Sequence, residues 1–179
     1  MIAHRKNAGF SMIEVLITIV ILMIGLLGLA GLQTKALTAQ MEAYQRSQAL
    51  ILLKDMVDRI SANRKKADFY VATLGTDVTA CPTTGNTVAD GDLCEWHNAL
   101  LGAAEVQDTA KVGAMIGARG CITRTVAPAP GAPSRYLVAV AWQGLNSTAV
   151  PAIDCGKDEY GNEKLRRVVA LPVNIADLN

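Results

Sequence analysis

The sequence has few histidines and no excess of charge of either sign. Its 179 residues include 17 Lys and Arg against 16 Asp and Glu, which leaves a formal net charge of +1. Because nucleic-acid-binding domains normally carry a clear basic excess, this balance gives no indication of a nucleic-acid partner. The two histidines are His4 and His97, and none of the four cysteines forms a C-x-x-C pair. The usual ligand patterns of a zinc site are therefore missing, and we expect no metal.

The sequence motifs of the common enzyme classes are also missing. The chain contains no G-x-S-x-G, H-E-x-x-H, P-loop or Rossmann fingerprint. His97 follows Trp96 and is interpreted as a packing or surface histidine rather than a catalytic base. Two acidic segments, residues 90–92 and 154–159, lack the full spacing of a calcium loop and are interpreted as turns. We therefore expect no enzymatic activity, no catalytic residue and no cofactor.

A long apolar run is present near the N-terminus, from Val15 to Leu32. Its 18 residues are enough for a helix that spans the hydrocarbon core of a membrane. Arg5 and Lys6 precede the run, and only Lys35 follows it closely. By the positive-inside rule, the short N-terminus stays in the cytoplasm and the rest of the chain is exported.

Glu14 lies at the start of this apolar run and restricts the interpretation. A carboxylate at the centre of a membrane helix costs about 2.5–3.5 kcal/mol, and such residues usually have a partner. A secretory signal peptide would end in a small-residue cleavage site after the run, but residues 33–35 are Gln-Thr-Lys and the helical pattern continues. A plain signal anchor fits the hydropathy and leaves Glu14 unexplained.

Residues 9–16, with the sequence GFSMIEVL, resemble the processing site of type IV prepilins. The resemblance implies that a membrane peptidase cleaves between Gly9 and Phe10 and that the new N-terminal Phe10 is N-methylated. Cleavage would remove Arg5 and Lys6 and so make the helix extractable from the membrane. The resemblance also implies a role for Glu14, whose carboxylate would neutralise the α-amino group of a Phe10 when helices pack together.

No helix breaker occurs between Leu32 and Asn63, so we expect one helix from Phe10 to Asn63. Its apolar stripe changes position along the helix. We expect the lower face to meet neighbouring subunits; it consists of Leu37, Met41 and Tyr44. We expect the upper face to pack on the chain's own sheet; it consists of Ala49, Leu52, Met56 and Ile60. The alternative is a single curved core stripe.

The remaining sequence predicts a small, mostly antiparallel β-sheet domain. We expect linker or loop structure over 64–74 and 76–92, and short helices around 96–101 and 109–116. Alternating apolar residues predict strands at Cys121–Val126, Tyr136–Trp142 and Val168–Val173. Pro172 has no amide donor and suits an edge strand. Arg166 and Arg167 are expected on opposite sides of a strand, with one of them solvated.

All four cysteines lie beyond the apolar run. An even number in this position favours two disulfides in an oxidising compartment, the alternative being four reduced thiols in a cytosolic domain. Four cysteines allow three connectivities. We favour Cys81–Cys94, which closes a local loop, and Cys121–Cys155, which ties the first strand to the loop between the next two.

Residues 135–144, Cys155 and residues 166–169, taken with residues 10–33, resemble PilV-type minor pilins over about a third of the chain. In major pilins the last disulfide usually closes a loop near the chain end, whereas here a full strand follows Cys155. The receptor-binding role of that loop is therefore not carried over.

The resemblance and the residue patterns together predict an α+β fold, a long N-terminal α-helix with a small antiparallel β-sheet domain. We expect a leader peptide at 1–9, a transmembrane and assembly helix at 10–33, its amphipathic continuation at 34–63 and a periplasmic globular domain at 64–179. Before assembly the protein would cross the inner membrane once, with a cytoplasmic N-terminus. After assembly it would lie in a pilus on the cell surface.

The implied function is that of a minor pilin, which is processed by prepilin peptidase and initiates or modifies pilus assembly. The implied partners are the major pilin and other minor pilins through the N-terminal helix, prepilin peptidase, the inner-membrane assembly platform and a tip adhesin. One alternative is a minor pseudopilin of a type II secretion system. Another is a membrane-tethered periplasmic binding protein, which would retain residues 1–9 and have no use for Glu14.

Overall fold

The structure is a computed structural model that describes residues 9–102, 106–107, 110–111 and 115–176, with the side chains of 106–107 and 110–111 left out. Most of the expected leader peptide, residues 1–8, lies outside the described residues. The chain divides into two compact units, Met1–Met41 and Glu42–Asn179. We call the first the N-terminal unit and the second the globular unit.

Helix α1 (Met12–Ala62) runs through both units, as the absence of helix breakers predicts. The globular unit then adds the 3-10 helices η1 (Arg64–Tyr70) and η2 (Glu163–Leu165), α2 (Thr87–Leu100), and the strands β1 (Ala72–Gly75), β2 (Val106–Gln107), β3 (Ala110–Lys111), β4 (Ile116–Val126), β5 (Ser134–Gln143) and β6 (Arg166–Ile175). The expected α+β architecture is confirmed.

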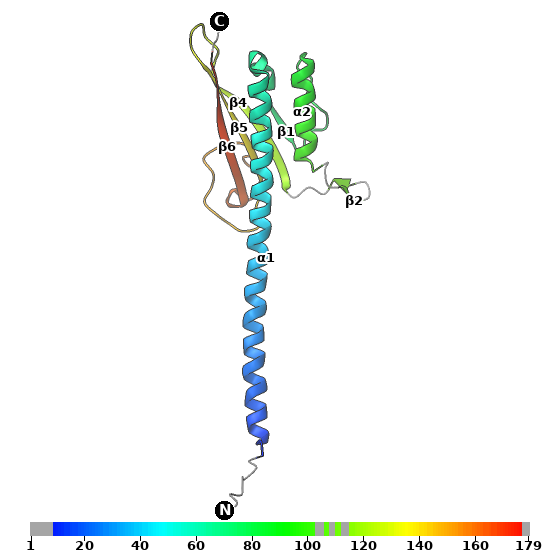
Figure 1. Cartoon of the computed structure of the whole chain (residues 1–179), viewed down its shortest axis with the longest axis vertical. Coiled ribbons are helices and arrows are strands. Elements are labelled where there is room, and N and C mark those ends of the chain that lie inside the picture. The colour runs from blue at the N-terminus through cyan, green and yellow to red at the C-terminus, as the bar shows by residue number, and fades with distance from the viewer. Residues whose placement is uncertain (1–8, 103–105, 108–109, 112–114, 177–179) are drawn as a thin grey trace, which may run out of the picture. The chain divides into compact units, whose positions relative to one another are not determined.

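Four strands form an antiparallel sheet in the order β1-β4-β5-β6. Helix α2 and the second half of α1 both pack against one face of this sheet (Figure 1). The buried side chains of that core include Leu53, Met56 and Ile60 from α1 and Val138, Val140 and Trp142 from β5. Residues of β5 that alternate in the sequence therefore share one buried face, as expected.

The opposite face of the sheet is covered by the long connection between β5 and β6. Cys155 and Tyr160 from this connection pack on Cys121, Ala139 and Ala141 of the two central strands. Strand β6 is an edge strand, and its Pro172 pairs with Leu137 of β5, in agreement with the expected position of a residue without an amide donor.

The prediction of a loop over 76–92 is wrong for residues 87–92, because these residues form the first part of α2. Asn86 caps this helix, because its side-chain oxygen accepts a hydrogen bond from the Ala89 N–H at 3.1 Å. The helix is stabilised by a buried stripe at helical spacing, which consists of Ala89, Leu93, Trp96 and Leu100. Tertiary burial therefore outweighs the low helix propensity of this Thr-, Gly- and Asp-rich segment.

Two further expectations for this region are wrong. Residues 64–74 contain η1 and β1 rather than a linker, and Ala72 of β1 pairs with Ile122 of β4. The helix expected around 109–116 is absent from its described residues, because Ala110–Lys111 pairs with Val106–Gln107 and Ile116 begins β4. Residues 109 and 112–114 of that prediction lie outside the described residues.

Candidate functional site

The start of α1 presents a continuous apolar surface. Every large apolar side chain from Phe10 to Leu32 is between 44% and 86% exposed. Burying one such side chain is worth about 1.5–3 kcal/mol. The segment also contains an 18-residue window long and apolar enough to cross a membrane, none of it buried. This surface therefore requires hydrocarbon or other helices around it.

Glu14 is the one carboxylate in this apolar segment, and it lies in the first turn of α1. Its N–H donates to the Ser11 carbonyl at 3.0 Å, and its side chain is exposed. None of the ion pairs among the described residues includes Glu14. The helix N-terminus favours a negative charge, but only weakly. A membrane-embedded Glu14 therefore needs a cation from outside these residues.

Gly9 and Phe10 precede α1 and are both exposed, with Phe10 at 83%. A Cβ added at Gly9 would meet no atom within 4 Å. Packing within the described chain therefore does not require glycine at this position. A requirement for Gly9 and Phe10 has to come from a molecule that acts on the chain.

The two expected faces of α1 are distinct in the structure. Leu37, Met41 and Tyr44 are 62%, 50% and 46% exposed, whereas Ala49, Met56 and Ile60 are fully buried and Leu52 is half-buried. A single curved core stripe is therefore wrong for this chain. The upper face packs on the chain's own domain, and the lower face is left open.

Glu42, the first residue of the globular unit, holds the loop that follows β5. Its Oε1 atom accepts hydrogen bonds from the N–H groups of Leu145 and Asn146 at 3.1 and 2.9 Å, and from Arg167 Nη2 at 3.2 Å. Gly144 lies under the same guanidinium, since a Cβ there would come within 2.6 Å of Arg167 Cζ. We call this arrangement the Glu42 latch.

We expect the Glu42 latch to weaken in acid. Burial alone would raise the pKa of the Glu42 carboxyl, but the backbone hydrogen bond from Asn146 and the charge of Arg167 outweigh it and lower the pKa from its usual 4.5. The unfolded chain keeps the usual pKa. The latch is therefore fully present above about pH 4.5 and is lost as the pH falls through the lower, folded pKa.

Glu42→Gln should remove most of the contribution of the latch to stability, about 1.5–3 kcal/mol for a hydrogen bond to a charged group. Amide hydrogen exchange of Leu145 and Asn146 should become faster in Glu42→Gln than in the parent at pH 7, and the ratio should shrink towards pH 3.5. Asp58→Asn, which removes an exposed carboxylate elsewhere on α1, is the matched control. Equal protection in Glu42→Gln and the parent at pH 7 would contradict the latch.

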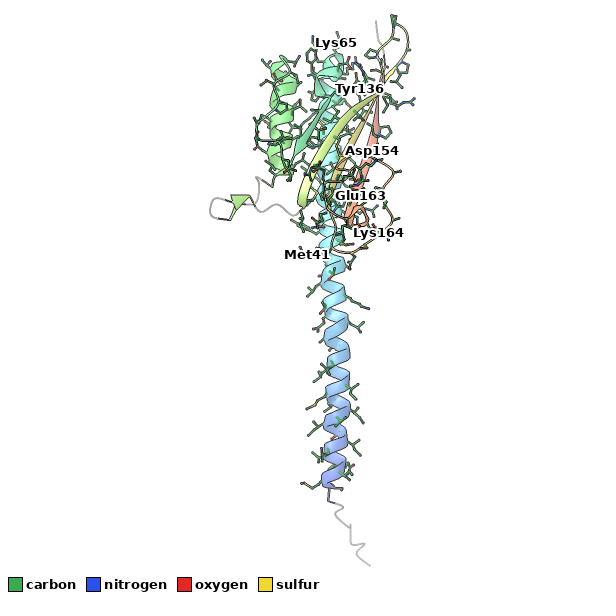
Figure 2. The ribbon with its side chains drawn as sticks, turned by 180° about the vertical axis from the view of Figure 1, so that it is seen from behind. Met41, Lys65, Tyr136, Asp154, Glu163 and Lys164 are labelled. Carbon is green, nitrogen blue, oxygen red and sulfur yellow. A yellow bond between two sulfur atoms is a disulfide. The ribbon has the colours of Figure 1, made fainter. Side chains whose placement is uncertain are left out.

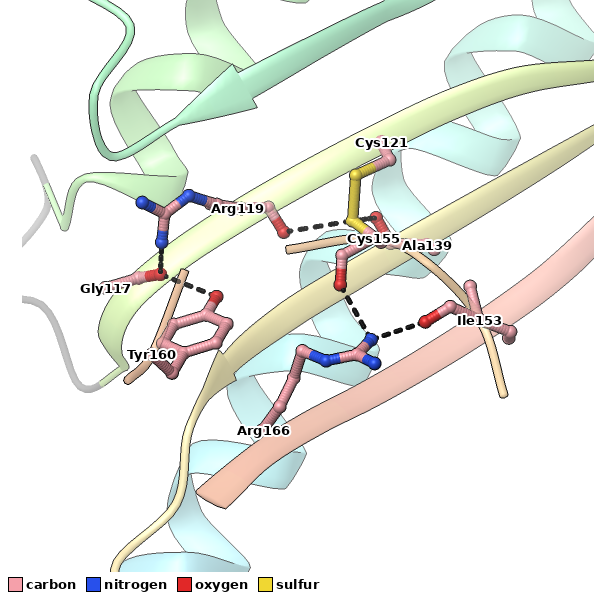
Figure 3. The surroundings of a disulfide bond; sticks show 8 residues. All are labelled: Gly117, Arg119, Cys121, Ala139, Ile153, Cys155, Tyr160 and Arg166. Carbon is pink, nitrogen blue, oxygen red and sulfur yellow. Dashed lines mark hydrogen bonds between the residues drawn. A yellow bond between two sulfur atoms is a disulfide. The ribbon is translucent and has the colours of Figure 1, made fainter. Parts of the chain in front are cut away.

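The structure contains two disulfides, Cys81–Cys94 and Cys121–Cys155, in the favoured pairing. The second one fastens the β5–β6 connection across the sheet (Figure 3). Tyr160 of the same connection donates to the Gly117 carbonyl at 2.9 Å. Burial raises the pKa of Tyr160, which keeps this donor protonated at neutral pH.

Arg166 lies beneath the same connection and is 1% exposed. Its guanidinium donates to the carbonyls of Ile153, Cys155 and Pro151, the last two at 3.1 and 3.2 Å, and pairs with Glu163. Arg167 points to the other face, as expected, but it is held by the Glu42 latch. The expectation that one of the two arginines is solvated is therefore wrong.

The acidic segments have structural partners. Asp90 accepts hydrogen bonds from Thr84, and Asp92 pairs with Arg59 at 2.9 Å. Both aspartates lie in α2, so the prediction of a turn at residues 90–92 is wrong. Residues 154–159 form turns, as expected. Within the described residues, no group of three or more His, Cys, Asp or Glu side chains is arranged to hold a metal ion. His97 is buried, and its Nδ1 accepts the Gly75 N–H at 3.1 Å.

Sequence reasoning missed the structural roles of Glu42, Arg119 and Arg166. Arg119 is 7% exposed and pairs with Asp77 and Glu159, which joins β4 to two loops. Glu42 had a detectable signal, because it is the one acidic residue between Glu14 and Asp55. Glu163 is only three residues from Arg166, but the other partners of the two arginines are loop carbonyls and distant carboxylates, which have no local sequence pattern.

Two family models match adjoining parts of the chain. The prokaryotic N-terminal methylation motif matches residues 4–30. The Tt1218-like family, described as type IV pilin Tt1218, matches residues 31–99. No curated protein and no solved structure matches the chain significantly.

Proposed function

Because the chain is a type IV pilin-like prepilin, as the two adjoining family matches support, we propose that it is a minor pilin of the PilV type. In this role it enters a type IV pilus as a low-copy subunit and helps to initiate or modify assembly. Pilins are structural proteins, and assembly with other pilins follows from the family. The minor role and the PilV subtype are the proposal.

The observation that carries the proposal is the combination of Gly9, Phe10 and Glu14 with an exposed apolar surface over the first part of α1. The described chain makes no structural use of Gly9, and it offers Glu14 no cation. Prepilin peptidase would recognise Gly9 and cleave between Gly9 and Phe10. A neighbouring helix would pair with Glu14, because its N-methylated Phe10 ammonium supplies the missing positive charge.

The proposed route begins with a single-pass inner-membrane precursor whose N-terminus is cytoplasmic and whose globular unit is periplasmic. The disulfides agree with that oxidising compartment. After cleavage, the assembly platform would extract the helix from the membrane into the filament. The exposed Leu37, Met41 and Tyr44 would then be covered by the major pilin and other minor pilins.

The proposed minor role depends on the lateral surface of the globular unit. A complete edge strand, β6, follows the last cysteine, and a proline-rich loop over 128–133 joins β4 to β5. These features give the subunit a different side from that of a major pilin, while α1 can still join the same helix bundle. Such a subunit can nucleate a filament with unlike neighbours, and a tip adhesin is one of them.

Quantitative mass spectrometry of sheared pili tests the minor role. We expect the protein far below the major subunit, and we expect a clean deletion to reduce surface pili while major pilin remains in the membrane. Near-equal abundance would identify a shaft protein. Unchanged piliation and twitching motility in the deletion strain would remove the priming role, and secretion by a type II system would then be the process to measure.

A further inference from the structure

We propose that a groove at one end of the globular unit binds an extended acidic segment of a partner protein. The groove, which we call the distal groove, has a volume of about 790 Å³ and lies between η1, the loop at 128–132 and the end of β6 at Ile175. Figure 2 shows Lys65 and Tyr136, two of its lining residues, at the same end of the unit. This volume is in the range of sites that bind small ligands and short chains.

The charged and polar groups at the floor of the distal groove have partners within the chain. Tyr136 is 1% exposed, and its hydroxyl donates to Asp68 Oδ1 at 2.7 Å. Burial and this hydrogen bond raise the pKa of Tyr136, so the hydroxyl stays protonated at neutral pH. Arg124 also pairs with Asp68 at 2.9 Å. The Asp68 carboxylate is therefore satisfied without the cations on the groove rim.

The rim carries positive charge that the chain does not neutralise. Arg64 and Lys65 are exposed, and neither side chain forms an ion pair or hydrogen bond with any residue in the described part of the chain. Lys66 follows them and lies over the Phe69 ring at 5.3 Å, which leaves its charge in place. In a chain whose charges nearly cancel, this cluster is a local excess, and it attracts carboxylates.

The opposite wall of the groove favours a peptide as the source of those carboxylates. It consists of Pro128, Pro130 and small residues between and after them, held by the Ala132 N–H that donates to the Ala129 carbonyl at 3.0 Å. Small, uncharged side chains leave room for an extended backbone. Single-stranded nucleic acids bind on exposed aromatic rings, but the ring that lines this groove, Tyr136, is buried.

A membrane surface fits the groove less well than a peptide. Binding of a protein to an anionic membrane normally combines cations with large apolar side chains that insert between the lipids. The apolar lining of the distal groove is mostly alanine and proline, with Ile175 as its one large aliphatic residue among those described. The combination of an unpaired cationic rim and a small-residue wall is therefore best matched by alternating acidic and small residues.

Fluorescence anisotropy of the full chain in non-ionic detergent, at low salt, tests this proposal. The probe is a labelled short peptide of alternating Glu and Ala, and its counterpart has Gln for Glu. The double variant Arg64→Glu/Lys65→Glu should weaken binding of the acidic peptide about tenfold or more, because two attractive charge pairs become repulsive. The control Arg46→Glu/Lys164→Glu makes the same charge change at exposed sites outside the groove and should bind like the parent.

A second variant tests the shape of the groove without changing its charge. Ala132→Trp fills the groove from the proline-rich wall and should also weaken binding, with the fold of each variant checked by circular dichroism and by intact disulfides. Equal affinity of the parent and Arg64→Glu/Lys65→Glu would overturn the proposal, as would equal weakening in the control. Tighter, groove-dependent binding of single-stranded DNA or of phosphatidylglycerol vesicles would also overturn it, in favour of that ligand.

Discussion

Replacing Glu14 with Ala is expected to leave the protein inserted and processed but to remove it almost completely from assembled filaments. No ion pair among the described residues includes the Glu14 carboxylate, which lies among exposed apolar side chains. If it neutralises the Phe10 ammonium of a packed helix, its loss leaves an uncompensated charge in an apolar surround. Breaking a buried ion pair in this way costs about 3–5 kcal/mol. We expect incorporation into sheared filaments to fall by at least about tenfold.

Two further variants separate charge from shape at this position. Glu14→Gln keeps the size of the side chain and should be lost from filaments as Glu14→Ala is. Thr18→Ala changes a polar side chain one turn further along the helix. Because the Thr18 hydroxyl donates to the carbonyl of Val15 in the same helix at 2.8 Å, this variant should assemble normally. Normal incorporation of Glu14→Gln would mean that the carboxylate is not paired in the filament.

Replacing Arg166 with Met is expected to destabilise the globular unit strongly. The buried guanidinium satisfies the carbonyls of Ile153, Cys155 and Pro151, and it neutralises Glu163. Methionine fills part of the volume but leaves these acceptors without donors. The loss should be about 3–5 kcal/mol, which corresponds to a fall in Tm on the order of 10 °C for a unit of this size.

Thermal unfolding of the oxidised full chain in detergent measures this effect. Arg135→Met is the matched control, since Arg135 lies on the neighbouring strand and is exposed, and its side chain bonds only Asn174 among the described residues. It should change the free energy of unfolding by less than about 1 kcal/mol. An Arg166→Met protein as stable as the Arg135→Met protein would show that Arg166 does not hold the β5–β6 connection.

The sequence was sufficient for the elements whose patterns are long and periodic. Helix α1 has no breaker over its length, and the large apolar residues of β5 occur at every second position, with Val138, Val140 and Trp142 in the core beneath the helices. The type of each element and the face that it buries therefore followed directly from the sequence. The change of apolar face along α1 was also readable, because Tyr44 and Met56 lie about 120° apart around the helix at about 100° per residue. The N-terminal methylation motif was readable because it depends on local spacing.

The elements that were missed are stabilised by partners distant in the sequence. Strand β1 has only four residues, and its pairing with Cys121 and Ile122 of β4 defines it. Gly75 at its end has a φ of +100° and lies so close to the Ala118 carbonyl that any side chain would collide with it. Neither constraint leaves a periodic signal in the sequence.

The partners of Glu42 and Arg166 were unpredictable for a related reason. Glu42 is more than a hundred residues from Leu145 and Asn146, and it binds their backbone N–H groups, which every non-proline residue has. Arg166 likewise binds backbone carbonyls. Contacts of this kind depend on the path of the loop rather than on the identity of the partner residue.

The mass of the N-terminal peptide of the protein recovered from purified filaments tests the central claim most directly. If the chain is a processed pilin subunit, the mature protein begins at Phe10 and carries one additional methyl group on its α-amino nitrogen, and a bulky residue in place of Gly9 abolishes this species. A chain in the filaments that retains residues 1–9 would contradict the claim. A mature chain that begins at a residue other than Phe10 and carries no methyl group would also contradict it.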